Sequence, residues 1–229
     1  MFFINFKLMM FIFLLFPFVA NGNQKSDLNN SENYKLNKES HFLKLKKEGK
    51  PVISDKWMVV TANIQASKIA AKILKNGGTA TDAMISAQLV LGLVEPESSG
   101  LGGGAFLVYF DNKTKEVITL DGRETAPLLI KENIFQDTNG NPLKFFDAVV
   151  GGKSVGTPGT PALLEEAYKR WGKTEWSLLF KDAIDLSNNG FVISKKLSSS
   201  IKRSKSSLNK FLNTKTYFLP NDIPLKSGN

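Results

Sequence analysis

The chain has 229 residues, of which 42% are hydrophobic and 22% charged, and its formal net charge is +9. This composition is typical of globular proteins and excludes a chain that is disordered throughout. Because the sequence holds no cysteine and one histidine, His41, it excludes disulfides, a Cys nucleophile and a multi-His metal site within these residues.

The first 22 residues are predicted to be a signal peptide. Lys7 precedes the apolar run LMMFIFLLFPFVA at residues 8–20, which is shorter than the roughly 20 apolar residues that a transmembrane helix needs. Small residues at Ala20 and Gly22 fit cleavage after Gly22. An uncleaved membrane anchor is the alternative. Both interpretations export the rest of the chain and predict a periplasmic or secreted protein.

A polar tether is predicted for residues 23–50, which are rich in Asn, Lys, Ser and Glu. Residues 51–229 are expected to be folded. A first helix is predicted before Gly77-Gly78 by apolar residues at helical spacing: Ala66, Ile69, Ala70 and Ile73.

A second helix is predicted from Thr79–Asp82, where either residue can cap it, to the residues before Pro96. Its body, AMISAQLVLGLV, is apolar on nearly every side, which indicates a helix buried inside a larger structure.

A glycine-rich loop at residues 100–104 precedes a predicted hairpin, with strands at residues 105–110 and 117–120. Phosphate-binding glycine loops follow a strand and open a helix. Here the loop follows a helix and opens a strand, and no Gly-Lys-Ser/Thr follows. The pattern therefore favours glycines that let two backbones approach closely.

The second half of the chain is predicted to be mainly helical. After a loop-like stretch to Gly152, Thr160 is the expected N-cap and Pro161 the first residue of a helix ending at Trp171. Another helix is expected from Trp176 to about Ser187, ending at Gly190, with one apolar face made by Trp176, Leu179, Ala183 and Leu186. One strand pair followed by several helices suits an α+β or layered αββα domain.

The stretch from residue 186 to 221 is basic, with seven Lys or Arg residues and no acid: Lys195, Lys196, Lys202, Arg203, Lys205, Lys210 and Lys215. One interpretation is a surface for nucleic acid or anionic membrane. The favoured one is a solvated helix face, because apolar residues fall on one side of a helix: Leu197, Ile201, Leu208, Phe211 and Leu212. A single-strand binder would also interleave aromatic residues with the cations.

Arg123 follows a predicted strand and a glycine. A guanidinium binds a carboxylate through two parallel hydrogen bonds, so Arg123 suits an anionic substrate. It suits equally a surface ion pair with Asp121 or Glu124, and the residues alone leave both interpretations open.

Several stretches resemble γ-glutamyltranspeptidases, in the order and spacing of that family, over roughly residues 51–229. They are ILKNGGTATDA (73–83), EPESSGLGGGAFLVYF (95–110), LDGRETAP (120–127), SVGTPGTPALLEEAYKRWG (154–172) and DAIDLSNNGFVIS (182–194). The resemblance implies an N-terminal-nucleophile hydrolase with an αββα sandwich, of which residues 51–229 would be a truncated large-subunit region.

The resemblance also implies a chemistry. In the family a precursor cleaves itself into a large and a small subunit, and the newly exposed N-terminal Thr attacks the γ-carbonyl of glutathione or a related compound, with its own amine as base. The γ-glutamyl ester then passes to water or an amino acid, and no cofactor is needed. The Arg of the motif matched by residues 121–124 holds the substrate α-carboxylate, a role that carries over to Arg123.

The family's nucleophile lies in a Thr-rich motif with a following His, and the only His here is His41. The resemblance therefore implies no catalytic residue within this chain, a small subunit of the same precursor as its partner, and an isolated chain without activity. The alternatives are a non-catalytic periplasmic binding protein and, less favoured, a binder of nucleic acid or membrane surfaces.

Overall fold

The structure is a computed structural model that describes residue 41 and residues 43–228. The predicted signal peptide and most of the predicted tether lie outside the described residues. The chain divides into two units, of which the first ends at Asp55 and the second begins at Lys56. In the first unit, residues 43–47 are helical. The second unit contains all the elements that follow, and no helix of the described part is long and apolar enough to cross a membrane.

The first two helices of the second unit lie where the sequence predicts them. Helix α2 spans Ile64–Lys75 and is capped by Asn63, whose side chain accepts from the Gln65 N–H. Helix α3 spans Ala80–Val94. Thr79 and Asp82 form a reciprocal capping box at its start, since each side chain accepts from the other residue's backbone N–H.

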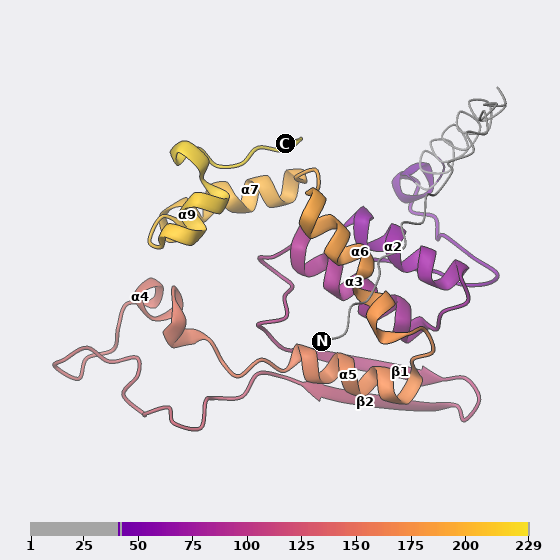
Figure 1. Cartoon of the computed structure of the whole chain (residues 1–229), viewed down its shortest axis with the longest axis horizontal. Helices are drawn as coiled ribbons and strands as arrows, with labels where there is room; N and C mark the ends of the chain where they lie inside the picture. Colours follow the sequence, from indigo (N-terminus) through magenta and orange to yellow (C-terminus); the bar gives the residue numbers. More distant parts are fainter. Residues whose placement is uncertain (1–40, 42, 229) are drawn as a thin grey trace, which may run out of the picture. The chain divides into compact units, whose positions relative to one another are not determined.

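Helix α3 is the centre of the core, as its all-round apolar sequence predicts. It contacts α2, α5 (Thr160–Trp171) and α6 (Trp176–Asn189) (Figure 1). The buried apolar residues of these four helices form one cluster: Ala66, Ala70, Ile73, Ala83, Ile85, Ala87, Leu89, Val90, Val94, Leu163, Leu164 and Leu179. Burial of this apolar surface is the main force holding the helices together.

Asp82 fixes the start of α3 to the turn between α5 and α6. Besides the Thr79 N–H at 2.9 Å, its carboxylate accepts from the Lys173 N–H at 3.1 Å and from the N–H and hydroxyl of Thr174, both at 3.0 Å. Burial alone would raise the pKa of Asp82, but these hydrogen bonds outweigh it and lower the pKa below its ordinary value. Asp82 is therefore charged at neutral pH and satisfied although it is buried.

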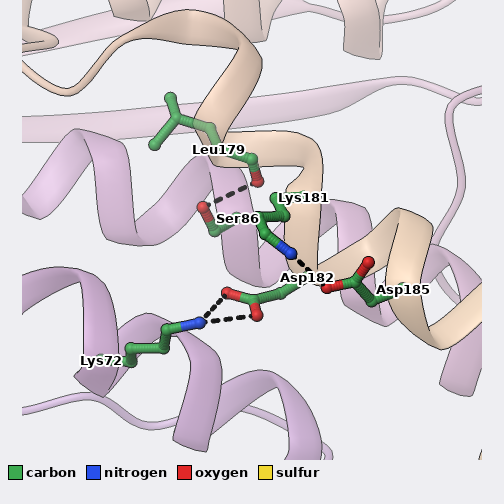
Figure 2. A network of polar contacts seen from close by, with 6 residues as sticks. All are labelled: Lys72, Ser86, Leu179, Lys181, Asp182 and Asp185. Atoms are coloured by element: carbon green, nitrogen blue, oxygen red, sulfur yellow. Dashed lines mark hydrogen bonds and ion pairs between the residues drawn. The ribbon is translucent and has the colours of Figure 1, made fainter. Parts of the chain in front are cut away.

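Helix α6 is tied to α2 and α3 by polar contacts (Figure 2). Lys72 on α2 donates to both oxygens of Asp182, at 2.8 and 3.0 Å. The buried Ser86 hydroxyl on α3 donates to the Leu179 carbonyl at 3.0 Å. Apolar burial holds these helices together, and the polar contacts fix their register.

Strands β1 (Ala105–Asp111) and β2 (Glu116–Gly122) form an antiparallel hairpin, each slightly longer than predicted. Helix α5 lies along one face of it (Figure 1), where Tyr109 stacks on Trp171 with ring centroids 4.1 Å apart. The opposite face, called the outer hairpin face below, is exposed and apolar. Its apolar members are between 55% and 72% exposed, namely Phe106, Val108, Phe110 and Val117, and the exposed Thr119 and Asp121 lie on the same face.

Helix α5 begins one residue earlier than predicted. Its N-cap is Gly159, and Thr160, expected as the cap, lies inside the helix. The cap position faces the hairpin so closely that a Cβ at residue 159 would come within 2.1 Å of the Gly122 carbonyl oxygen. Only glycine fits there, and Thr160 is consequently buried, with no hydrogen-bond partner for its hydroxyl among the described residues.

The stretch predicted as loop-like contains one short helix, α4 (Phe145–Val149), and is followed by a single 3₁₀ turn, η1 (Gly152–Ser154). The Ser154 hydroxyl donates to the Val149 and Gly151 carbonyls, at 2.7 and 3.2 Å. These bonds hold the turn against the end of α4.

The basic stretch folds into several short elements rather than one helix: α7 (Lys195–Arg203), α8 (Lys205–Leu208), α9 (Leu212–Phe218) and η2 (Pro220–Asp222). Leu197 and Ile201 are buried in a second cluster, as expected for an apolar helix face. For Phe211 and Leu212 the prediction is wrong, because Phe211 adopts an extended backbone that breaks the helical path and both side chains are exposed.

A buried carboxylate joins the C-terminal elements to the core. Glu95, at the end of α3, accepts from the Asn63 side-chain amide at 3.2 Å and pairs with Lys196 of α7. In the same stretch Lys210 pairs with Asp147 and Lys215 with Asp222. Part of the positive charge is thus neutralised within the fold, which favours the solvated-helix interpretation over a nucleic-acid surface.

Candidate functional site

Arg123 is the first residue after β2, and its backbone N–H donates to the Asp121 carboxylate at 2.9 Å. This short-range bond fixes how the chain leaves the strand. The Arg123 side chain is 70% exposed, and its Nε lies 3.3 Å from a Glu124 carboxylate oxygen. Within the described part of the chain the Arg123 guanidinium pairs with Glu124 but donates no hydrogen bond, so the N–H groups of its terminal Nη fork are available to a ligand.

The glycine-rich loop supports this strand end through its backbone. Its Gly103 carbonyl accepts from the Gly159 and Thr160 N–H groups at 3.0 and 3.1 Å. A Cβ at Gly104 would come within 2.7 Å of the Glu124 nitrogen and the Gly122 oxygen. At Gly104 the glycine therefore allows the close backbone approach that the sequence predicts.

Arg123 lines an open pocket of about 290 Å³. The lining comes from two loop segments, residues 123–127 with Ile130 and Phe135, and residues 153–156. An antiparallel bridge ties the segments together, because the Thr157 N–H donates to the Thr125 carbonyl at 2.9 Å. The geometry thus offers a concave site with a free guanidinium fork, suited to a small anionic compound.

Two further charged residues of this pocket, Glu124 and Lys153, are not among the site residues predicted from the sequence. Glu124 appeared there only as a surface ion-pair partner for Arg123. Lys153 has no motif signal: it precedes the SVGTPGTP stretch in a segment with no periodicity, and only the folded chain places it in the same pocket as Arg123.

No group of three or more His, Cys, Asp or Glu residues arranged to hold a metal ion occurs within residues 43–228. The charged residues of the Arg123 pocket are two cations and one carboxylate, a set that suits an anion rather than a metal ion.

Comparison with protein families matches residues 66–229 to the gamma-glutamyltranspeptidase family. Among curated proteins, a glutathione hydrolase proenzyme from Bacillus subtilis subsp. natto is 42% identical over 171 residues, which cover 75% of this chain and 29% of the relative. Glutathione hydrolase 3 from Arabidopsis thaliana is 35% identical over 191 residues, which cover 83% of this chain and 29% of the relative.

Comparison with solved structures leads to the same family. The gamma-glutamyltranspeptidase of Helicobacter pylori matches with a TM-score of 0.73 and 31% identity, over 78% of this chain and 51% of that one. The transpeptidase CapD of Bacillus anthracis matches with a TM-score of 0.61 and 25% identity, over 77% and 53%. The chain thus spans about half of each solved chain and less than a third of the curated relatives.

These matches confirm the expected fold class, the αββα sandwich of N-terminal-nucleophile hydrolases, of which the chain supplies the hairpin and its helical layer. The family match covers well over half of the chain, and two relatives that exceed 30% identity each cover at least three quarters of it. The chain therefore belongs to the gamma-glutamyltranspeptidase family.

Proposed function

We propose that this chain is the substrate-holding part of an enzyme that transfers or hydrolyses γ-glutamyl groups, with glutathione or a related γ-glutamyl compound as donor. The observation that carries the proposal is Arg123, whose guanidinium fork is free and lines a pocket of about 290 Å³ in a chain of this family. Two relatives are named glutathione hydrolases, which supports the substrate class.

Arg123 holds the α-carboxylate of the γ-glutamyl group. The carboxylate must leave water to bind, and a bidentate guanidinium replaces that hydration with two charge-assisted hydrogen bonds. Glu124 engages the guanidinium at Nε and so leaves the Nη fork for the substrate. Arg123 thereby fixes one end of the donor, so that its γ-carbonyl is presented to the nucleophile.

The nucleophile is an N-terminal Thr of a small subunit, made when the precursor cleaves itself. Its hydroxyl attacks the γ-carbonyl while its amine accepts the hydroxyl proton. The γ-amide C–N bond then breaks, the leaving amine of the donor takes up that proton, and the resulting γ-glutamyl ester is resolved by water or by an amino acid. Since His41 is the only histidine in residues 1–229, the Thr-rich motif with a following His has no counterpart in this chain. We expect the chain by itself to be inactive and the reaction to need no cofactor.

The enzyme acts outside the cytoplasm, in the periplasm or after secretion. The support is the sequence of residues 1–22, with one lysine before an apolar stretch and small residues at the expected cleavage site. Identification of the N-terminus of the exported protein tests this, since Asn23 is expected as the first residue.

Substitution of Arg123 in the active enzyme that contains this chain tests the proposal. Loss of a charged hydrogen-bonding partner costs about 1.5–3 kcal/mol, so Arg123→Ala should lower kcat/KM for glutathione by about 10- to 100-fold, mainly through KM. Arg123→Lys keeps the charge but loses the planar fork and should have an intermediate effect. Self-cleavage should continue in both variants, because it involves no substrate carboxylate.

Arg203→Ala is the matched control, because Arg203 lies on α7, bonds to Ser199 and does not line the pocket. Unchanged KM and kcat in Arg123→Ala would show that Arg123 is only a surface ion-pair residue. Binding of glutathione without any turnover by the fully assembled protein would favour the non-catalytic binding protein instead.

A further inference from the structure

The Arg123 pocket contains a second cation, which neither the family match nor the proposed role of Arg123 uses. Lys153 lies in η1, is exposed and lines the pocket. It comes from the second of the two loop segments, whereas Arg123 comes from the first. One small pocket thus collects two positive side chains from loops separated in sequence by 30 residues.

Lys153 is supported by its loop but not neutralised by it. The Ser154 hydroxyl holds the turn through the Val149 and Gly151 carbonyls, and the Thr157–Thr125 bridge ties this loop to the one that carries Arg123. Within residues 43–228, no carboxylate forms an ion pair with Lys153 and no acceptor receives a hydrogen bond from it. Its ammonium is therefore free for a ligand.

The charge of the pocket favours a ligand with more than one negative group. Its charged side chains are Arg123, Lys153 and Glu124, and Glu124 lies against Nε of Arg123. One carboxylate on the Nη fork would leave Lys153 uncompensated. A second carboxylate, some distance along the same ligand, would compensate it, and like charges lining one concave site concentrate anions there.

The apolar part of the lining and the size of the pocket limit the ligand further. Ile130 and Phe135 line the same pocket and offer contacts to a ligand's uncharged middle. The volume of about 290 Å³ lies just below the range of about 300–1,000 Å³ for ligand pockets, which favours a small ligand. A short peptide with a carboxylate at each end meets these conditions.

We propose that Lys153 selects γ-glutamyl donors whose leaving part carries its own carboxylate, as the C-terminal glycine of glutathione does. This inference rests on the proposed function. Arg123 holds the α-carboxylate, and Lys153 attracts the carboxylate at the other end of the donor. Lys153 is thus a specificity residue: it distinguishes a γ-glutamyl peptide acid from a neutral γ-glutamyl amide.

A matched pair of donors tests the proposal, namely glutathione and glutathione with its C-terminal carboxylate converted to an amide. In the active enzyme that contains this chain, Lys153→Gln should lower kcat/KM for glutathione by about fivefold, the upper range for a solvent-exposed ion pair. For the amide, kcat/KM should stay within about twofold. The preference of the unmodified enzyme for the acid should shrink as ionic strength rises, and Lys153→Gln should abolish this salt dependence.

Lys144→Gln is the control, because Lys144 is exposed, precedes α4 and does not line the pocket. It should not alter the acid-to-amide preference. Equal losses on both donors in Lys153→Gln, or no loss on either, would overturn the proposal. Arg123→Ala, measured on the same donors, separates the two proposals. If Arg123→Ala lowers kcat/KM for both donors while Lys153→Gln leaves the acid-to-amide preference unchanged, the proposed function stands and only the role of Lys153 is lost.

Discussion

The core around α3 and the outer hairpin face differ in whether their side chains find partners within the chain. In the core, even the charged and polar groups Asp82 and Ser86 have partners supplied by the chain itself. On the outer hairpin face, by contrast, Phe106, Val108 and Phe110 are left in solvent.

The core is a region that the chain stabilises by its own contacts, whereas the outer hairpin face is a surface available to a neighbouring layer or molecule. A contiguous exposed apolar surface on a sheet marks a contact surface or an aggregation risk. In an αββα sandwich the second sheet covers such a face. The core should therefore govern the stability of this chain, and the outer hairpin face should govern its association.

The largest effect on stability is expected from Asp82→Ala. The Asp82 carboxylate accepts from four donor groups, which belong to Thr79, Lys173 and Thr174. Its removal leaves all four without this acceptor and breaks the capping box. The free energy of unfolding in urea should fall by at least about 3 kcal/mol. Asp185→Ala is the control, since Asp185 pairs with Lys181 on an exposed helix surface (Figure 2) and should matter far less.

The same carboxylate predicts a pH dependence. The pKa of Asp82 is lowered on folding, so its stabilising contribution is complete above the ordinary Asp pKa of about 3.9 and is lost as the pH falls through the lower, folded value. The stability difference between the chain and Asp82→Asn should therefore be constant near neutral pH and shrink below about pH 4. A difference that stayed constant down to pH 2 would contradict a charged, hydrogen-bonded Asp82.

A smaller effect on stability, but a clear one on association, is expected at the outer hairpin face. The double variant Phe106→Ser/Val108→Thr should reduce light scattering and the binding of a hydrophobic dye, and should shift the urea midpoint little, because both side chains are already in water. A soluble, monomeric unmodified chain with no dye binding would contradict an uncovered contact face.

Leu128→Ser/Leu129→Ser provides the comparison for that variant. Both leucines are almost fully exposed, but they lie in a loop rather than on a sheet face. If their replacement lowers association as much as the hairpin variant does, apolar exposure in general, and not the outer hairpin face, drives association.

The smallest effect is expected for Thr160→Val. The Thr160 hydroxyl is buried without a partner among the described residues, so replacing it with a methyl group of similar shape should leave stability unchanged or raise it by up to about 1 kcal/mol. Ser86→Ala, which loses the bond to the Leu179 carbonyl, should lower stability by about 1 kcal/mol. Equal losses in both variants would mean that the Thr160 hydroxyl is satisfied.

Local patterns predicted most of the secondary structure because the deciding residues are neighbours in sequence. The capping box of Thr79 and Asp82, the helical spacing of Ala66 and Ile73, and the stop at Gly190 each lie within a few residues of the element that they define. Where a distant contact decides, prediction failed: the start of α5 is set by Gly159 against Gly122, far apart in sequence.

Of the two cations of the candidate site, the sequence singled out Arg123 but not Lys153, for the same reason. For Arg123, at a strand end, the residues alone left a carboxylate ligand and a surface ion pair equally open, and the family resemblance of its motif implied the ligand. Lys153 carries no such signal, and its place in the pocket depends on the bridge between Thr125 and Thr157, which no local pattern encodes. Likewise, the partners of Asp82 at Lys173 and Thr174 lie about ninety residues away.

The contact of Gly159 with the hairpin has a mechanical consequence. A Cβ at this position would also lie 2.9 Å from the Arg123 carbonyl oxygen, so the backbone of Arg123 packs closely against the first turn of α5. A shift of the Arg123 backbone should therefore displace the first turn of α5, whereas its exposed side chain can turn by itself. Because Trp171 stacks on Tyr109 at the far end of α5, a change in Trp171 fluorescence on ligand binding would report such a shift.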